Sequence, residues 1–241
     1  MKLDILVLSA HPDDAELGCG GTIALHVALG KAVGMVDFTR GELGTRGNAH
    51  TREQEAQAAA QILGLKLRQN LEMADGFFEI NREHKMQVIE VIRRFRPEIV
   101  LGAAPLDRHP DHSRAAELIR QACFLAGLSK IITYDPDGYE QSAWRPRHLF
   151  HFIQDYSLNP SFVVDISAYW DIKLEAVQAF KTQFYHPEAD MEAPQTPISS
   201  PDFIHFLEGR AREMGRMIGT TYGEGFIKAS PPGVRDLFQL L

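Results

Sequence analysis

The sequence predicts an α/β fold, a Rossmann-like three-layer sandwich with a mostly parallel sheet. Short, continuous apolar runs alternate with amphipathic stretches along most of the 241-residue chain. Continuous apolar runs are typical of strands that are buried on both faces. Because such strands need helices on both sides of their sheet, the alternation indicates a series of βαβ units.

The first expected elements lie around two polar segments. The run 5–8 is apolar throughout and predicts a buried strand, and the helix 16–29 after it ends at Gly30. A second strand, 33–38, precedes a glycine-rich loop at 41–47. Between the first strand and its helix lies the polar segment that carries the first candidate site residues.

The next helix, 52–63, is expected to begin after Thr51 as its N-cap, because Glu53 and Glu55 place acid in its first turn. It stops at Gly64, and a weak strand follows at 65–71.

A third helix, 82–96, carries apolar residues at three-residue spacing. Its basic end, Arg93 to Arg96, is expected to be solvated, in agreement with the preference for cations at a helix C-terminus. A strand at 99–101 and a helix at 113–126 complete the first half.

The second half continues the pattern. The expected elements are strands at 148–153 and 162–166 and helices at 169–184 and 201–217. The segment 187–201 holds four prolines and is interpreted as a lid or an oligomer contact, against the simpler interpretation of a surface loop. We expect a single domain, 1–241, in which 1–126 carries the chemistry and 127–241 supplies the remaining elements.

Composition excludes several classes of protein. The net charge is −7, from 25 basic and 32 acidic residues, and no basic run offers a nucleic-acid face. Two cysteines, Cys19 and Cys123, are no disulfide framework and are expected as small buried hydrophobes. No apolar stretch approaches the roughly 18 residues that span a bilayer, and the N-terminus does not have the pattern of a signal peptide. The expected location is the cytoplasm, without nucleic-acid or membrane partners.

Two polar clusters follow predicted strands. His11, Asp13 and Asp14 come directly after the first strand, and the segment 107–112 follows the strand at 99–101. Ligand sites of open α/β sheets lie beyond the carboxyl ends of strands. Each cluster alone could be a turn in which aspartates cap the next helix. Two clusters at one rim favour a shared site.

The residue types in these clusters favour a metal. Two imidazoles and one carboxylate form a common open zinc site that leaves a position for water, and a second carboxylate can take a proton from that water. His11 and His112 are the imidazole candidates. Asp13 and Asp14 share the two carboxylate roles, and the residue types do not say which does which.

Two other classes remain as alternatives. Gly18, Gly20 and Gly21 with Asp37 imitate a dinucleotide-binding fingerprint and hence an NAD(P)-dependent oxidoreductase, but the spacing fails because the sixth position is Ile23. Those glycines are better explained by close packing of the first helix on the sheet. The second alternative is a non-catalytic sugar-binding module.

The motifs resemble a known family. Residues 10–16 read A-H-P-D-D-A-E and match the A-H-P-D-D-x-E signature of the PIG-L/LmbE-like zinc N-deacetylases, and residues 109–112 match its second motif, H-P-D-H. The loop 39–42 is also similar, and the resemblance covers about 3–126. The segments 180–184 and 197–203 resemble the bacillithiol-biosynthesis branch, which deacetylates N-acetylglucosaminyl malate.

The resemblance implies roles for individual residues. It implies that His11, Asp14 and His112 bind Zn²⁺, or Fe²⁺ in the resting enzyme, and that Asp13 is the general base. His109 would stabilise the oxyanion as a cation, and Asp111 would orient His109 or a neighbouring ligand. The products would be a free amino sugar and acetate. We also expect the protein to form a homo-oligomer.

Substrate contacts are expected from residues near the rim. Arg52 and Asp75 resemble the positions where family members hold sugar hydroxyls, and Arg108 and Arg46 could bind a carboxylate of the aglycone. A surface position is the simpler interpretation for Arg46, and a plain turn is the alternative for Asp75. Some relatives add a tyrosine from a downstream loop, for which Tyr185 is the candidate here.

Overall fold

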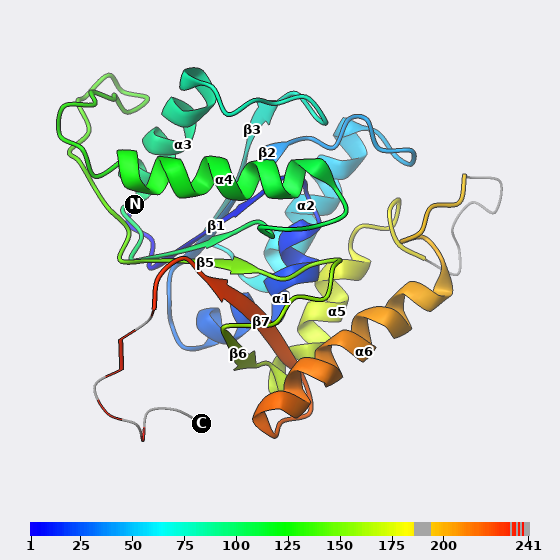
Figure 1. Cartoon of the computed structure of the whole chain (residues 1–241). Coiled ribbons are helices and arrows are strands. Elements are labelled where there is room, and N and C mark those ends of the chain that lie inside the picture. The colour runs from blue at the N-terminus through cyan, green and yellow to red at the C-terminus, as the bar shows by residue number, and fades with distance from the viewer. Residues whose placement is uncertain (186–193, 232, 235, 237, 239–241) are drawn as a thin grey trace.

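The computed structural model describes residues 1–185, 194–231, 233–234, 236 and 238. Over these residues the chain forms a seven-stranded sheet in the order β3-β2-β1-β4-β5-β7-β6 (Figure 1). β1 to β5 run parallel, whereas β7 pairs antiparallel with both β5 and β6. The strands are β1 (Ile5–Ser9), β2 (Val33–Thr39), β3 (Leu67–Met73), β4 (Ile99–Gly102), β5 (His148–Phe152), β6 (Phe162–Asp165) and β7 (Gly223–Lys228).

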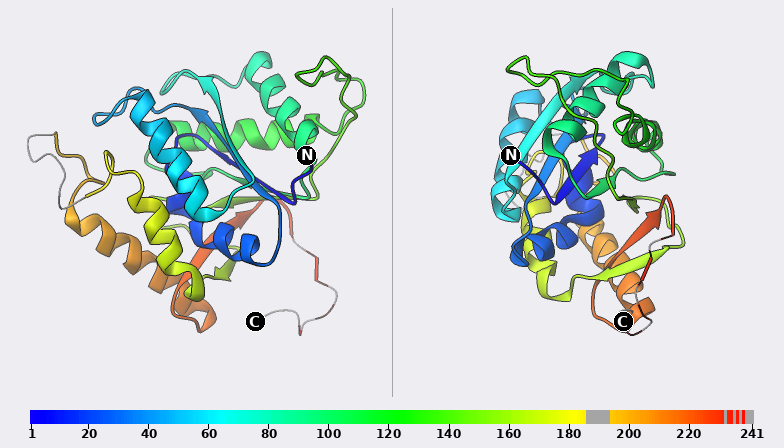
Figure 2. Two further views of the ribbon diagram at one scale, coloured as in Figure 1. Left: turned by 180° about the vertical axis from the view of Figure 1, so that it is seen from behind. Right: turned by 90° about the vertical axis from the view of Figure 1, so that its left-hand side faces the viewer.

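Helices cover both faces of the sheet. Figures 1 and 2 show α1, α2 and α5 on one face and α3 and α4 on the other, while α6 packs against β6 and β7. The predicted three-layer, mostly parallel α/β fold is therefore confirmed. The helices are α1 (Asp14–Ala28), α2 (Ala49–Leu63), α3 (Arg82–Phe95), α4 (Pro110–Leu125), the 3₁₀ turn η1 (Ser167–Tyr169), α5 (Trp170–Gln178) and α6 (Pro201–Ile218).

The continuous apolar runs form the centre of the sheet. Every residue of β1 and β2 is buried, because helices lie on both sides of these two strands. Cys19 and Cys123 are both buried thiols, as expected. The burial of two whole strands explains why most of their side chains are apolar.

Two helix starts differ from the prediction. α2 begins at Ala49, and its N-cap is Asn48, whose side chain accepts a hydrogen bond from Thr51 N while the Thr51 hydroxyl accepts one from Asn48 N. Thr51 is therefore the third residue of a reciprocal cap. α4 begins at Pro110, so the second motif forms its first turn and His109 is its N-cap.

The basic end of α3 is solvated only in part, because Arg94 and Arg96 are exposed whereas Arg93 is not. Arg93 is buried, and its guanidinium donates to the carbonyls of Ala126, Leu128 and Ile131. It therefore holds the loop after α4 and is not part of a solvated helix end. The same loop gains a further contact from Arg93 to the Thr133 hydroxyl.

The second half differs more from the prediction. The helix expected at 169–184 is shorter and ends at Gln178, and β7 was not expected. Residues 187–193 of the predicted proline-rich lid or oligomer contact lie outside the described residues, whereas 194–200 form a loop and Pro201 begins α6. Among the helices of the described chain, none is long and apolar enough to span a membrane.

Candidate metal site at the sheet switch point

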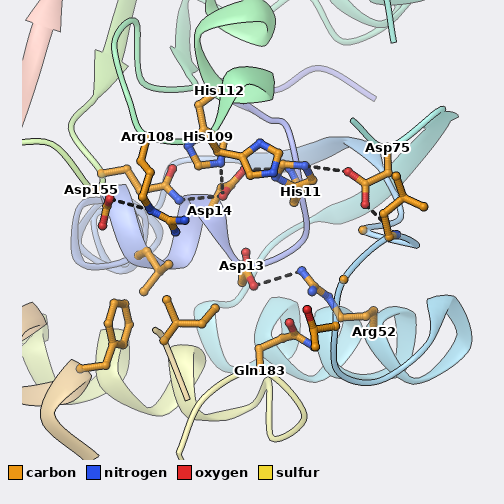
Figure 3. A pocket seen from close by; sticks show the side chains of 18 of the residues that line it. His11, Asp13, Asp14, Arg52, Asp75, Arg108, His109, His112, Asp155 and Gln183 are labelled. Carbon is orange, nitrogen blue, oxygen red and sulfur yellow. Dashed lines mark hydrogen bonds and ion pairs between the residues drawn. The ribbon is translucent and has the colours of Figure 1, made fainter. Parts of the chain in front are cut away.

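The two polar clusters meet where the strand order reverses. The chain passes from β1 to β2 and β3 on one side, and β4 lies next to β1 on the other, so the carboxyl ends of β1 and β4 form a switch point. A pocket of about 340 Å³ lies there (Figure 3). Its lining includes the predicted site residues His11, Asp13, Asp14, Arg52, Asp75, Arg108, His109 and His112.

Asp13 has an unusual backbone. Its φ is 111°, in a region that residues other than glycine rarely adopt. Arg52 of α2 supports this conformation, because its Nη2 donates to the Pro12 carbonyl and, at 3.0 Å, to Asp13 Oδ2. The Asp13 carbonyl also accepts the Leu17 amide at 3.0 Å, which starts α1. The strained residue is therefore held from both sides.

Two imidazoles converge on Asp14. His11 Nδ1 lies 3.3 Å from Asp14 Oδ2, and His112 Nε2 lies 3.1 Å from Asp14 Oδ1. All three side chains are buried, and Figure 3 shows them together on one side of the pocket. The three predicted ligands thus lie close together, His11 from the loop before α1, Asp14 from the start of α1 and His112 from the first turn of α4.

Each of these imidazoles turns its other nitrogen to a carboxylate. His11 Nε2 lies 3.0 Å from Asp75 Oδ1 and 3.2 Å from Asp111 Oδ2. His112 Nδ1 lies 3.3 Å from Asp107 Oδ2. A carboxylate behind a histidine is the usual support of a metal ligand, because it fixes the tautomer and the ring orientation. The donor set therefore fits a metal held by nitrogen and oxygen ligands.

The electrostatics of the cluster favour a cation. Burial alone would lower the pKa of His112, but Asp14 and Asp107 raise it to about 9. Burial acts on His11 in the same way, yet Asp14 and Asp111 hold its pKa well above the ordinary value. Burial would raise the pKa of Asp14, but the two imidazoles hold it well below its usual range. The carboxylates thus stabilise positive charge at the position that the imidazoles share.

Other donor combinations also lie close together. Within the described chain, two sets of three donor atoms lie within 4.8 Å of one another: His11, His109 and His112, and His11, Asp75 and Asp111. His11 belongs to both sets. The cluster therefore offers more donors than a single ion with an open position needs.

Asp13 and His109 have electrostatic properties that suit chemistry. Burial raises the pKa of Asp13 to about 7, against the opposing effect of Arg52, so this carboxyl can exchange a proton near neutral pH. Burial, together with His11 and His112, lowers the pKa of His109 below its ordinary value. His109 Nδ1 accepts the Asp111 amide at 3.3 Å, so a neutral ring carries its proton on Nε2. These contacts favour a neutral ring, and the expected positive charge on His109 stays a prediction.

Asp111 supports His11 and not His109. Its Oδ2 accepts the Gly76 amide at 2.8 Å and contacts His11, and its Oδ1 binds Arg114 Nη1 at 2.5 Å. Of the two orientations that the sequence left open, the structure places Asp111 on the neighbouring ligand. Arg114 was not predicted, although it lies one helical turn after Asp111 and could have been found by that spacing.

The four predicted substrate residues lie in different environments. Arg52 binds Asp13, and Asp75 binds His11 and the Leu43 amide. Arg108 lines the pocket and pairs with Asp155 at 3.0 Å, whereas Arg46 is buried and is not among the lining residues. Tyr185 is exposed and also lies outside the lining.

Several lining residues were missed by the sequence analysis. Gln154, which follows β5, donates to Asp14 Oδ1 at 2.7 Å. Its place after a predicted strand at the same rim was a usable signal. Arg210 of α6 donates to the Asp155 carbonyl. The remaining side of the pocket is apolar and comes from Ile198, Phe203, Phe206 and Leu207.

The residues of the dinucleotide alternative have other partners. Asp37 is buried and binds the Ser9 hydroxyl at 2.7 Å and Arg68 at 2.8 Å. A Cβ atom at Gly18 would lie 2.3 Å from Phe152, and one at Gly21 would lie 2.7 Å from Ile166. These glycines therefore permit close packing of α1, as expected.

The fold and the site define an α/β protein with a His/Asp cluster that could hold a metal ion at its sheet switch point. Residues 6–123 match the family model PIG-L, described as GlcNAc-PI de-N-acetylase. A diacetylchitobiose deacetylase of Thermococcus kodakarensis is 30% identical over 92% of this chain and 81% of its own length. The chain belongs to the PIG-L deacetylase family, whose deacetylases are metal-dependent.

Other relatives differ in the activity that their names record. A 4-oxalmesaconate hydratase of Pseudomonas putida is 28% identical over 74% of this chain and 73% of its own length. A probable N-acetyl-α-D-glucosaminyl L-malate deacetylase of Bacillus subtilis is 26% identical over 76% and 84%. The structure of a conserved protein from Thermus thermophilus superposes with a TM-score of 0.85 at 36% identity, over 98% of both chains.

Proposed function

We propose that the protein hydrolyses the acetamide of an N-acetylglucosamine conjugate at a metal held by His11, Asp14 and His112. One observation carries the proposal: both imidazoles meet the carboxylate of Asp14, while the adjacent Asp13 has a pKa of about 7. An ion site beside a carboxyl that exchanges protons near neutrality is what hydrolysis of an unactivated amide requires.

A bound zinc or ferrous ion would polarise the acetamide carbonyl and lower the pKa of water from about 15.7 toward about 7. Asp13 then takes a proton from the attacking water and hands it to the leaving amine. The neutral ring of His109 donates from Nε2 to the oxyanion of the tetrahedral intermediate, a contact of a kind often worth about 3 kcal/mol. Asp75, Asp111 and Asp107 hold His11 and His112 in the required tautomers.

The finer proposal concerns the aglycone. We place a malyl group, as in N-acetylglucosaminyl malate of bacillithiol biosynthesis, beside Arg108 and Arg210. Arg108 pairs with the Asp155 carboxylate and Arg210 donates to the Asp155 main-chain carbonyl, so two guanidinium groups lie beside Asp155 at the pocket wall. A carboxylate of the substrate would compete with Asp155 for Arg108, whose side chain is 55% exposed. In this proposal the enzyme works in the cytoplasm as a homo-oligomer.

Two other substrates remain candidates. A second sugar ring, as in the name of the Thermococcus relative, could lie against the apolar wall formed by Phe203, Phe206 and Leu207. The similarity to a hydratase favours a different reaction, the addition of water to a carbon–carbon double bond. Deacetylation and hydration both need an activated water, so the two reactions are distinguished by the substrate that the protein accepts.

The test combines metal analysis with an acetate-release assay. Protein purified without added metal is analysed for zinc and iron and is then assayed on N-acetylglucosaminyl malate, methyl N-acetylglucosaminide and diacetylchitobiose. We expect bound metal and a malyl preference in kcat/KM of roughly ten- to a hundredfold, the worth of one charged contact. Arg108→Ala should reduce that preference, while Arg120→Ala, an exposed arginine paired with Glu117, should leave it unchanged.

The results separate the candidates. Equal turnover of the malyl and methyl substrates would refute the carboxylate proposal and leave the deacetylase proposal standing. Absence of acetate from every substrate, with hydration of a conjugated enoate, would identify a hydratase instead.

A further inference from the structure

Helix α1, which begins at the candidate metal site, is interrupted. Cys19 has φ −148° and ψ 21°, outside the helical region, so Asp14 to Leu17 form a first segment and the residues after Cys19 form a second. A break in a buried helix leaves carbonyls at the end of one segment and N–H groups at the start of the next without intrahelical partners. Water cannot satisfy them because every residue from Asp14 to Ala24 is buried.

Two charged side chains from the second half of the chain satisfy these groups. Lys173 of α5 donates from Nζ to the Leu17 carbonyl at 2.8 Å. Glu224 of β7 accepts the Gly21 amide at 3.0 Å and the Thr22 amide at 2.7 Å. The two side chains pair with each other at 2.5 Å and are each 3% exposed. The cation thus lies at a helix C-terminus and the anion at a helix N-terminus, as the helix dipoles favour.

The contact at Leu17 leads directly to the catalytic carboxylates. The Leu17 carbonyl binds Lys173, and the Leu17 amide binds the carbonyl of Asp13 at 3.0 Å. Leu17 also lines the pocket. One residue therefore connects Lys173 to the strained backbone of Asp13, while Asp14 lies in the same turn.

The attraction between the two charges does not by itself explain this arrangement. Two charges removed from water lose hydration that their attraction does not always repay, and apolar replacements of buried pairs are often neutral or stabilising. The glycines beside the break leave room for it, since a Cβ at Gly20 would lie 3.3 Å from Lys173 Cγ. An apolar pair would leave the Leu17 carbonyl and the Gly21 and Thr22 amides without partners.

We propose that Lys173 and Glu224 are positioning residues, which hold the first turn of α1 and thereby set the orientation of Asp13 and Asp14 at the metal site. This inference rests on the proposed function for its link to catalysis. Lys173 and Glu224 lie outside the part of the chain that the family model matches, 6–123, so they connect the second half of the molecule to the site.

The test uses the whole chain and a matched control. Lys173→Met removes the buried cation at the break in α1. Arg93→Met removes another buried cation that donates to main-chain carbonyls, but from α3 to the loop after α4. For each variant we would measure the melting temperature, the zinc affinity of the metal-free protein, kcat and KM, and hydrogen exchange of the Leu17 amide.

Both variants should lose melting temperature. Lys173→Met should also weaken zinc binding and lower kcat by roughly ten- to a hundredfold, the range found when supports of metal ligands are removed. KM should change much less, because the substrate wall is intact. The Leu17 amide should exchange faster in Lys173→Met, while Arg93→Met should keep the parent's zinc affinity, kcat and Leu17 exchange.

A Lys173→Met protein that keeps zinc affinity, kcat and Leu17 protection would overturn the proposal and leave a purely structural pair. If Lys173→Met does not fold because Glu224 is left unpaired, the double variant with Glu224→Gln removes that charge and is measured in its place. If the parent neither binds zinc nor releases acetate, the proposed function fails. Leu17 exchange in metal-free protein then still decides whether the pair holds the turn.

Discussion

At the scale of single residues, Asp13 shows how the site combines strain and charge. A φ of 111° costs on the order of 1–3 kcal/mol and persists because surrounding contacts offset that cost, and aspartate and asparagine tolerate positive φ better than most residues. Arg52 supplies those contacts and also opposes the rise in the pKa of Asp13 that burial causes. Arg52, expected at the substrate, therefore contacts the proposed base.

Asp13→Asn should keep fold and metal and lose turnover. Asparagine can adopt the same backbone angles, but its amide cannot accept the proton of the attacking water. We expect kcat to fall by about 10²- to 10⁴-fold, the usual contribution of a general base. Acetate release and zinc stoichiometry, measured on the same preparation, check this.

Variants of the proposed ligands should lose metal as well as turnover, unlike Asp13→Asn. His11→Ala and His112→Ala should lose most of the bound metal along with activity, since each removes one of the three proposed ligands. If Asp13→Asn lost metal while Asp14→Asn retained it, the roles of the two aspartates would be exchanged.

At the scale of helices and strands, prediction succeeded where one local signal dominates. The apolar runs of β1, β2 and β4 were found because both faces of these strands are buried. β7 was missed because Gly223 and Gly225 interrupt its pattern and Glu224 is a buried acid within it. Glu224 accepts main-chain amides of α1, a contact that the local sequence pattern of β7 does not reveal.

A similar limit applies to α1 and α3. The glycines of α1 correctly predicted close packing, but the break at Cys19 depends on Lys173 and Glu224, which are far away in sequence. Arg93 was expected in solvent because its neighbours are basic, whereas the carbonyls that it binds follow α4. The break in α1 and the burial of Arg93 both involve contacts between segments that are distant in sequence, which local patterns do not reveal.

The strand β5 provides a pH-dependent contribution to stability. His151 is buried, and its Nδ1 donates to the Ala103 carbonyl at 2.8 Å. Burial lowers the pKa of His151 below 6.5, against a smaller opposing effect of that hydrogen bond. In the pH range between the lowered folded value and the unfolded value near 6.5, the unfolded chain binds more protons than the folded one. Folding stability should therefore fall as the pH drops through this range.

His151→Asn isolates this contribution. The asparagine Nδ2 can donate to the same carbonyl but does not titrate. The melting temperature of the parent should fall more than that of His151→Asn between pH 7 and acidic pH. Parallel pH dependences in the two proteins would show that His151 does not contribute.

At the scale of the whole molecule, the sequence located the site better than it assigned the partners within it. His11, Asp14 and His112 were brought together as expected, because adjacent parallel strands end at one rim. Asp75 and Arg52 lie at the site but bind His11 and Asp13. Such pairings depend on loop conformations, which motif spacing does not define.

The single domain predicted over 1–241 should unfold as one unit, without a boundary at residue 126. β4 pairs with β5 across that boundary, and Lys173 and Glu224 bind within α1. We expect one calorimetric transition, with calorimetric and van't Hoff enthalpies that agree. Two resolved transitions in the metal-free protein would show instead that the halves unfold separately.

The order of strands in the sheet also has a consequence for synthesis on the ribosome. β7 lies between β5 and β6 but is made after both. Until Gly223–Lys228 has emerged, β6 has no neighbour to join and β5 presents an open edge to other nascent chains. A growing chain therefore holds every proposed metal ligand by residue 112, and Glu224, which closes the break in α1, is added only near the end of translation.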